Sequence, residues 1–418
     1  MKTEKNYVKK NSKDVLKAVG NFCEYYKTIG DYILKSKVIS SVDRGAFSRP
    51  HQVLDSSLRE YLGKKRRSKS FAYGPESGDY KLRETIAEVE NLKHKTKYNL
   101  KNVAIVPGAW SGVELVLEEL ARLKKGKSKQ TKILVFGPTH YQLFHRAINV
   151  LGIEFICFDF VKRGKSSVPA ELEEIEEALA LKPCAIFVTN PNNPNGEYFD
   201  SNLLERLIKR AKEKGIHIII DEIQDFFTSK GKIGLNYGPW INEDNVIRID
   251  SYSKKRGLAE YRVGWVIANE KILGDRLTGV IGRMSGLMGN APRSANNLLL
   301  KLLDLEKKKI LGGKDYFKLK WNSLAKKEEY VKKSLKNIPE IEFLNRESCI
   351  NLTFRVNLPI SDKEFSRKLM DKGILLMPCS GYGYLPEDTV MRFTFAERWK
   401  KIDYAIKKIK EVIYETKK

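Results

Sequence analysis

The stretch of sequence best suited to chemistry begins where a short apolar run ends. Residues 245–250 have the length and composition of a buried strand, and Ser251, Ser253 and Lys254 follow at once, with Arg262 a little further along. A lysine amine can form a Schiff base with an aldehyde cofactor, while hydroxyls and a guanidinium hold that cofactor's phosphate. In a chain with 77 Lys and Arg residues, the same stretch is also typical of a solvated loop, so its context must decide.

The elements that must position this lysine alternate between strands and helices. Amphipathic helical patterns, such as the one at residues 171–179, separate a series of apolar runs. These runs stand at residues 103–106, 133–136, 155–158, 185–188, 216–220 and 245–250. Continuous apolar strands that alternate with helices indicate a parallel sheet covered on both faces. We therefore predict an α/β fold with a mostly parallel central sheet and helices on both faces, joined by a smaller α+β domain.

Polar loops follow several of these strands. They occupy residues 137–141, 189–196, 221–225 and 251–257. Because the carboxyl ends of parallel strands meet at one edge of a sheet, where ligands of open α/β sheets bind, we expect these loops to form one site. The turn at residues 107–112 opens a helix whose free N–H groups could hold a phosphate, although such a turn is equally common without a ligand.

Length and composition limit the domain organisation and the compartment. At 418 residues the chain suits an N-terminal segment over residues 1–60 that is part of a small domain, a large cofactor-binding domain over residues 61–310, and a C-terminal small domain over residues 311–418. No run of about 18 apolar residues is present and the N-terminus is charged, so we expect a cytoplasmic protein without a membrane partner. Five scattered cysteines without a Cys-x-x-Cys pair argue against disulfides and a zinc site.

The formal net charge of +25 suggests a nucleic-acid partner at first sight. The lysines, however, are spread along nearly every predicted helix and often stand beside glutamate, as on solvated helix faces. The exception is a dense basic run, Lys64-Lys65-Arg66-Arg67-Ser68-Lys69. This run is compatible with a surface loop or with an anion-binding role.

A set of motifs resembles the class I/II aminotransferases, the pyridoxal-phosphate enzymes of fold type I, from about Tyr73 to Ala396. In the family's order they are Tyr73-x-x-x-x-Gly78-x-x-x-Leu82-Arg83, Asn190-Pro-Asn-Asn193-Pro-Asn-Gly196, Asp221-Glu222, Ser251-x-Ser253-Lys254 with Arg262-x-Gly264, and Met391-Arg392-Phe393-Thr394-Phe395-Ala396. The resemblance implies pyridoxal 5'-phosphate as cofactor and a homodimer.

The resemblance also implies a role for each motif residue. Lys254 would hold the cofactor as a Schiff base and later move a proton, and Asp221 would keep the cofactor's ring nitrogen protonated. Asn193 would bind the ring hydroxyl and contact the substrate. Arg392 would bind the substrate α-carboxylate, with Gly45 as a further substrate contact. The implied phosphate ligands are the backbone amides of Ala109 and Trp110, the side chains of Ser251, Ser253 and Arg262, and Tyr73 from the second subunit.

Three positions depart from the family's pattern. Gln224 stands where a tyrosine usually donates a hydrogen bond to the ring hydroxyl, so an amide must supply that bond or it is lost. His140 stands where an aromatic residue usually stacks on the ring; Tyr141 is next to it, and we choose His140. Cys379 replaces the glycine expected after Pro378, where a packing role is favoured over redox chemistry.

The function implied by the resemblance is transfer of an amino group between an L-amino acid and a 2-oxo acid. A lyase or decarboxylase reaction on the same cofactor stays open, since the fold does not determine which bond at Cα breaks. A nucleic-acid-binding regulator is the alternative from another class. Such regulators carry an added N-terminal helix-turn-helix domain, for which the segment before Tyr73 leaves little room.

Overall fold

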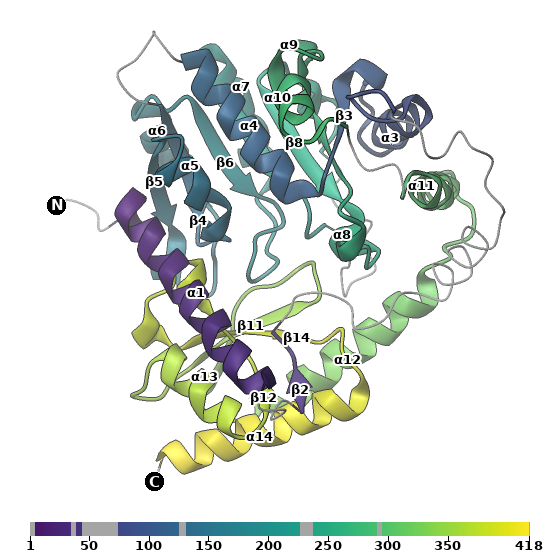
Figure 1. Cartoon of the computed structure of the whole chain (residues 1–418). Coiled ribbons are helices and arrows are strands. Elements are labelled where there is room, and N and C mark those ends of the chain that lie inside the picture. Colours follow the sequence, from purple (N-terminus) through teal and green to yellow (C-terminus); the bar gives the residue numbers. More distant parts are fainter. Residues whose placement is uncertain are drawn as a thin grey trace.

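The computed structural model describes residues 5–34, 39–43, 74–124, 131–225, 237–290 and 295–417. Gly45, Tyr73 and the basic run at residues 64–69 lie outside the described residues. Within the described ranges, an eight-stranded sheet forms the centre of a larger body, and a four-stranded and a two-stranded sheet belong to a smaller one, drawn below it in Figure 1. No helix of the described ranges has the length and the apolar character needed to cross a bilayer.

The eight-stranded sheet has the order β1-β5-β4-β6-β7-β8-β9-β3 in the described chain. Its strands are β1 (Val8–Asn11), β3 (Val103–Val106), β4 (Lys132–Gly137), β5 (Glu154–Asp159), β6 (Ala185–Thr189), β7 (His217–Asp221), β8 (Val246–Ser251) and β9 (Gly264–Ile267). Neighbours from β5 to β8 are parallel, whereas β1 and β9 run antiparallel to their partners. The predicted mostly parallel α/β sheet is confirmed, and β1 and β9 were not predicted.

The inner strands of this sheet are buried because helices cover it, whereas the edge strand β1 is partly exposed. Ile218, Ile219 and Ile220 on β7 are fully inaccessible, as expected of a β-branched run with both faces covered. The helices of the larger body are α3 (Tyr80–His94), α4 (Ala109–Lys124), α5 (His145–Asn149), α6 (Leu172–Ala180), α7 (Ser201–Glu213), α8 (Tyr252–Lys255), α9 (Glu270–Leu273), α10 (Gly279–Met288) and α11 (Asn296–Ile310). Asp79 caps α3, since its side chain accepts a hydrogen bond from the Leu82 amide at 3.0 Å.

The smaller body is built around an antiparallel sheet with the order β10-β11-β14-β13 in the described chain. Its strands are β10 (Ile341–Phe343), β11 (Asn351–Val356), β13 (Met377–Pro378) and β14 (Val390–Thr394), and β12 (Ile374–Leu375) pairs separately with β2 (Ser40–Ser41). The helices α12 (Lys318–Lys336), α13 (Asp362–Asp371) and α14 (Trp399–Lys417) pack on it. The predicted smaller α+β unit is confirmed, while the residue boundaries between domains stay a prediction.

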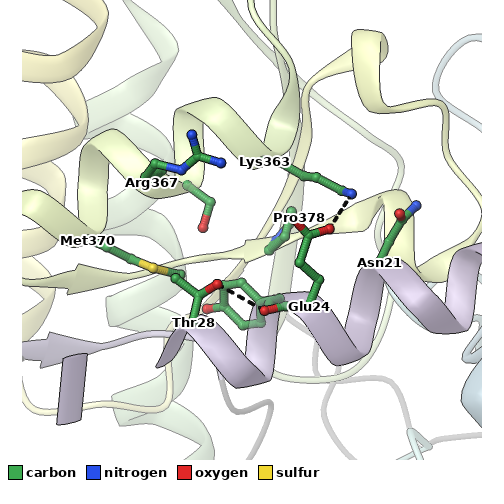
Figure 2. A pocket seen from close by; sticks show the side chains of 9 residues that line it. Asn21, Glu24, Thr28, Lys363, Arg367, Met370 and Pro378 are labelled. Atoms are coloured by element: carbon green, nitrogen blue, oxygen red, sulfur yellow. Dashed lines mark hydrogen bonds and ion pairs between the residues drawn. The ribbon is translucent and has the colours of Figure 1, made fainter. Parts of the chain in front are cut away.

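Helix α1 (Ser12–Leu34) runs along both bodies (Figure 1). Its first turns lie near β5, and its later turns lie against α13, where the Glu24 carboxylate accepts a hydrogen bond from the Lys363 ammonium at 2.6 Å and forms an ion pair with it (Figure 2). The cavity between α1 and α13 drawn in Figure 2 has a volume of about 30 Å³, which is space for water rather than for a cofactor. Helix α1 therefore joins the larger body to the smaller one.

Candidate active site

A cavity of about 460 Å³ lies at the carboxyl edge of the large sheet and reaches the smaller body. The predicted site residues that line it are Ala109, Trp110, His140, Asn193, Asp221, Gln224, Lys254 and Arg392. They come from the ends of β3, β4, β6, β7 and β8 and from β14. The chain therefore brings distant parts of its sequence to one place.

Lys254 is the lysine that reaches this cavity. β8 ends at Ser251 and the short helix α8 follows, so Lys254 stands just beyond the carboxyl end of a central strand. The neighbouring Lys255 is 5% exposed, and its ammonium is paired with the buried carboxylate of Asp250. Of two adjacent lysines, one is thus neutralised in the interior and the other faces the cavity.

The environment of Lys254 favours its neutral form. The pKa of the amine is lowered to about 8, chiefly because the amine is withdrawn from water and additionally because the charges of Arg392 and Arg262 repel a further proton. Neutral amine is the nucleophilic form. Lys254 can therefore attack a carbonyl at a pH where an ordinary lysine is almost wholly protonated.

Asp221 is the last residue of β7 and is 6% exposed. Its Oδ1 accepts a hydrogen bond from the Ile223 amide at 3.1 Å. Burial raises the pKa of the Asp221 carboxyl to about 7, and the adjacent Glu222 adds to the rise. A cationic N–H group placed beside this buried carboxyl would stabilise the ionised form of the carboxyl.

Close backbone packing assembles a candidate anion site beside Lys254. A Cβ added to Gly264, at the start of β9, would lie 2.6 Å from the Ala109 amide nitrogen. A Cβ added to Gly108 would lie 2.6 Å from Nη2 of Arg262. The two glycines therefore let the Arg262 guanidinium lie over the turn that opens α4, where the first helical N–H groups have no partner within the helix.

Ser251 and Ser253 lie beside this site and are not among the residues that line the cavity. The buried Ser251 hydroxyl accepts a hydrogen bond from the Ser253 amide at 3.2 Å and so caps α8. Ser251 stands opposite Gly264 in the β8–β9 register, and Gly264 touches Ala109. Ser251, Arg262 and the Ala109 amide, three of the groups predicted to bind a phosphate, thus lie where β3, β8 and β9 share one edge, whereas Tyr73 is outside the described residues.

Arg392 lies on β14 and is 5% exposed. Its Nη1 donates to the Tyr382 hydroxyl and, at 3.3 Å, to Oδ1 of Asn193, and its Nη2 donates at 2.6 Å to the backbone oxygen of Asp43. Nε of Arg392 is buried and finds no hydrogen-bond partner among the described residues. The guanidinium is therefore held in place and keeps a donor for an incoming carboxylate.

His140 lies among aromatic rings. Its ring meets those of Phe22, Trp110 and Tyr382 edge-on, at centroid distances of 5.0, 5.5 and 5.4 Å. Withdrawal from water, with the charges of Arg392 and Lys254, lowers the pKa of His140 to about 3, so the ring is neutral at working pH. The next residue, Tyr141, is fully buried, and its hydroxyl bonds to Asp159 outside the cavity.

Gln224 and Cys379 are the remaining departures from the family's pattern. Gln224 is 2% exposed and lines the cavity, and its Oε1 is buried without a hydrogen-bond partner among the described residues. Cys379 is fully buried among apolar side chains that include Phe22 and Met377. An unsatisfied amide at the cavity is costly unless a ligand satisfies it.

Several lining residues were not predicted from the sequence. They are Phe22, Tyr26, Val113, Gln142, Leu143, Ile223 and Tyr382. Phe22 and Tyr26 stand four positions apart on α1, a spacing that puts both on one helix face, but nothing local shows what that face meets. Tyr382 belongs to the segment after Pro378, three positions beyond Cys379.

Comparison with known proteins gives consistent matches. The family model described as aminotransferase class I and II matches residues 46–409. An aspartate aminotransferase of Sulfolobus acidocaldarius is 28% identical over 264 residues, covering 63% of this chain and 64% of that protein. One of Sulfurisphaera tokodaii is 25% identical over 400 residues, covering 93% and 94%. The solved alanine aminotransferase from Pyrococcus furiosus superposes with a TM-score of 0.77 at 20% identity, over 97% of this chain and 99% of that one.

Proposed function

The chain belongs to the aminotransferase class I and II family and is an aminotransferase, and from this premise we propose that it uses pyridoxal 5'-phosphate, bound to Lys254 as a Schiff base, to move an amino group between an L-amino acid and a 2-oxo acid. One observation carries the proposal. Lys254, Asp221 and Arg392, from separate elements, line a single cavity of about 460 Å³. A nucleophilic amine, a carboxyl that favours a cationic neighbour and a buried guanidinium are the groups that this chemistry requires.

The cavity's own properties support this cofactor. The Asp221 carboxyl, whose pKa is raised to about 7, suits a protonated ring nitrogen. The turn before α4, with Arg262 over Gly108, suits a phosphate dianion. The Oε1 of Gln224, which has no hydrogen-bond partner among the described residues, supports a contact with a ring substituent that donates a hydrogen bond. When bound, pyridoxal phosphate supplies an electron sink for the negative charge that develops at the substrate's Cα.

The chain's side chains then have distinct tasks. Arg392 binds the substrate α-carboxylate, and Asn193, 3.3 Å from that guanidinium, contacts both the substrate and the ring hydroxyl. With the cofactor and substrate bound, the Lys254 amine would move the proton between the substrate Cα and the cofactor's C4′. His140 would offer the cofactor ring a neutral aromatic surface. Gly45 and Tyr73 would complete the substrate and phosphate contacts.

The proposal is tested with purified protein and pyridoxal phosphate. We expect a visible absorbance band, and 2-oxo acid formed in step with new amino acid when an amino donor and 2-oxoglutarate are supplied. Ammonia and 2-oxo acid formed without a new amino acid would support elimination instead. Lys254→Ala should lose the band and turnover, whereas Lys271→Ala, an exposed lysine on α9, should keep both. A protein that stays colourless, or a Lys254→Ala variant that turns over, would refute the proposal.

The proposal extends to the oligomeric state of the protein, its location in the cell and the boundaries of its domains. We infer a homodimer in which Tyr73 reaches the phosphate of the second subunit, and a cytoplasmic location. We also infer a large domain over residues 61–310 and a small domain over residues 311–418 that includes the segment 1–60. Light scattering of the purified protein tests the dimer. A Tyr73→Phe variant with unchanged affinity for pyridoxal phosphate would contradict the role of that hydroxyl.

A further inference from the structure

The Arg392 end of the cavity is walled by aromatic rings. Phe22 from α1 meets the ring of His140 at 5.0 Å and that of Tyr382 at 5.7 Å, both edge-on. Tyr26, one turn further along α1, packs at 5.0 Å from Phe22 and also lines the cavity. The guanidinium carbon of Arg392 lies 5.0 Å from the centroid of the Tyr382 ring. The group that would bind the α-carboxylate is therefore bordered by a continuous aromatic surface.

Cations are few in the same cavity. Among the described residues that line it, the charged side chains are Asp221, Lys254 and Arg392. The proposed function uses all three for the cofactor and the α-carboxylate. The buried Asp43, whose backbone oxygen accepts from Arg392, brings a further acidic residue to this end. A second carboxylate on the substrate would therefore meet no additional cation in the described wall, and an unpaired buried carboxylate is costly.

From these two observations we propose that the enzyme prefers amino acids with a large neutral side chain, aromatic or bulky aliphatic, over the dicarboxylic amino acids. Phe22 and Tyr26 are the specificity-determining residues, because α1 contributes both rings to the cavity wall at the Arg392 end. The Tyr382 hydroxyl orients Arg392, so it affects the binding of every amino acid substrate to a similar extent. The inference rests on the proposed function, since it takes Arg392 as the α-carboxylate site.

The expected preference follows from burial. An aromatic side chain gains from contact with apolar and aromatic surface, and edge-on ring pairs add to that gain. A carboxylate at the same place loses water and meets no further cation among the described residues that line the cavity. Differences of this kind change kcat/KM by roughly 10-fold to 200-fold.

The test measures how fast each amino acid alone changes the visible absorbance of the cofactor-loaded enzyme, which needs no amino acceptor. L-Phenylalanine and L-leucine should react with kcat/KM at least about tenfold higher than L-aspartate and L-glutamate. L-Aspartate or L-glutamate reacting as well as L-phenylalanine would overturn the inference and leave the proposed function standing. Failure of every amino acid to change the absorbance would refute the proposed function itself.

Variants separate the aromatic wall from the carboxylate site. Phe22→Ala should lower kcat/KM for L-phenylalanine about tenfold relative to kcat/KM for L-alanine. Phe22 is 5% exposed, so Tyr26→Ala, which removes a ring that is 43% exposed, serves as a second variant with less risk to folding. Tyr382→Phe should raise KM for all amino acids by a similar factor and leave their order unchanged.

Tyr414→Ala is the matched control, because this tyrosine is 62% exposed on α14, outside the lining of the cavity. It should leave the order of preference and each kcat/KM unchanged. If both Phe22→Ala and Tyr26→Ala keep the loaded cofactor and the wild-type order of preference, the assignment of specificity to α1 is wrong.

Discussion

The ammonium of Lys10 lies 2.6 Å from the carboxylate of Asp159, and this ion pair joins the N-terminal strand β1 to β5. Asp159 is fully buried and also accepts the Tyr141 hydroxyl, while Lys10 donates to the backbone oxygen of Gly383. Burial raises the pKa of the Asp159 carboxyl, against the opposing pull of Lys10. The pair therefore lies between the two loops that carry His140 and Tyr382, and it holds both in place.

Replacing Lys10 by methionine should destabilise the protein. The substitution leaves the buried Asp159 carboxylate without its cation, a loss of about 3–5 kcal/mol in buried pairs. Lys5→Met is the matched control, because Lys5 pairs with Glu177 at 2.8 Å on the surface, where such pairs contribute less than about 1 kcal/mol. Urea unfolding measures both free energies of unfolding. Equal losses in the two variants would show that burial of the Lys10 pair contributes nothing.

Replacing Gly264 by alanine should damage both stability and cofactor binding. The new Cβ would lie 2.6 Å from the Ala109 nitrogen and 2.9 Å from the Asp250 oxygen, which are backbone atoms that cannot turn aside. We expect a loss of about 1–3 kcal/mol and weaker binding of pyridoxal phosphate. Gly286→Ala in α10 has open space around the new Cβ and should be neutral or slightly stabilising. Unchanged affinity in Gly264→Ala would argue against a phosphate at this turn.

The pH dependence of Asp221→Asn should reveal the buried carboxyl. In the cofactor-free protein the pKa of Asp221 is raised to about 7, above its unfolded value, so its contribution to stability is present at low pH and is lost as pH rises towards and beyond 7. Relative to wild type, Asp221→Asn should therefore gain a few kcal/mol between pH 5 and pH 8, since one pKa unit corresponds to about 1.4 kcal/mol. Urea unfolding at both pH values measures the gain. With pyridoxal phosphate bound, the same substitution should destabilise.

The rate at which cofactor-free protein captures pyridoxal phosphate should report the pKa of Lys254. Because that pKa is lowered to about 8, the rate should rise about tenfold per pH unit below 7 and level off above about 8. Stopped-flow absorbance follows the reaction. Arg392→Gln removes one of the charges that lower this pKa, so its profile should level off at a higher pH. A wild-type rate that still rises at pH 10 would mean an ordinary lysine.

Local signals in the sequence were enough to predict the inner strands of the large sheet and the polar loops that follow them. The isoleucine run of β7 and the Pro-rich loop after β6 can be interpreted from a few neighbouring residues, because strand and turn preferences are local. The edge strand β1 reads Val-Lys-Lys-Asn and carries too little apolar pattern to be predicted. It exists because it pairs antiparallel with β5, which is distant in the sequence.

The sequence by itself determined the chemical groups of this protein: the lysine after β8, the aspartate at the end of β7, the arginine of β14, and the order of motifs that matches one family. The motif selected Lys254, and the tertiary structure supplies the physical reason that the adjacent Lys255 does not compete, because the buried Asp250 neutralises it. Tertiary structure alone decided that α1 supplies Phe22 and Tyr26 to the wall beside Arg392. These outcomes depend on packing and charge pairing between segments far apart in the chain, which no local pattern of residues encodes.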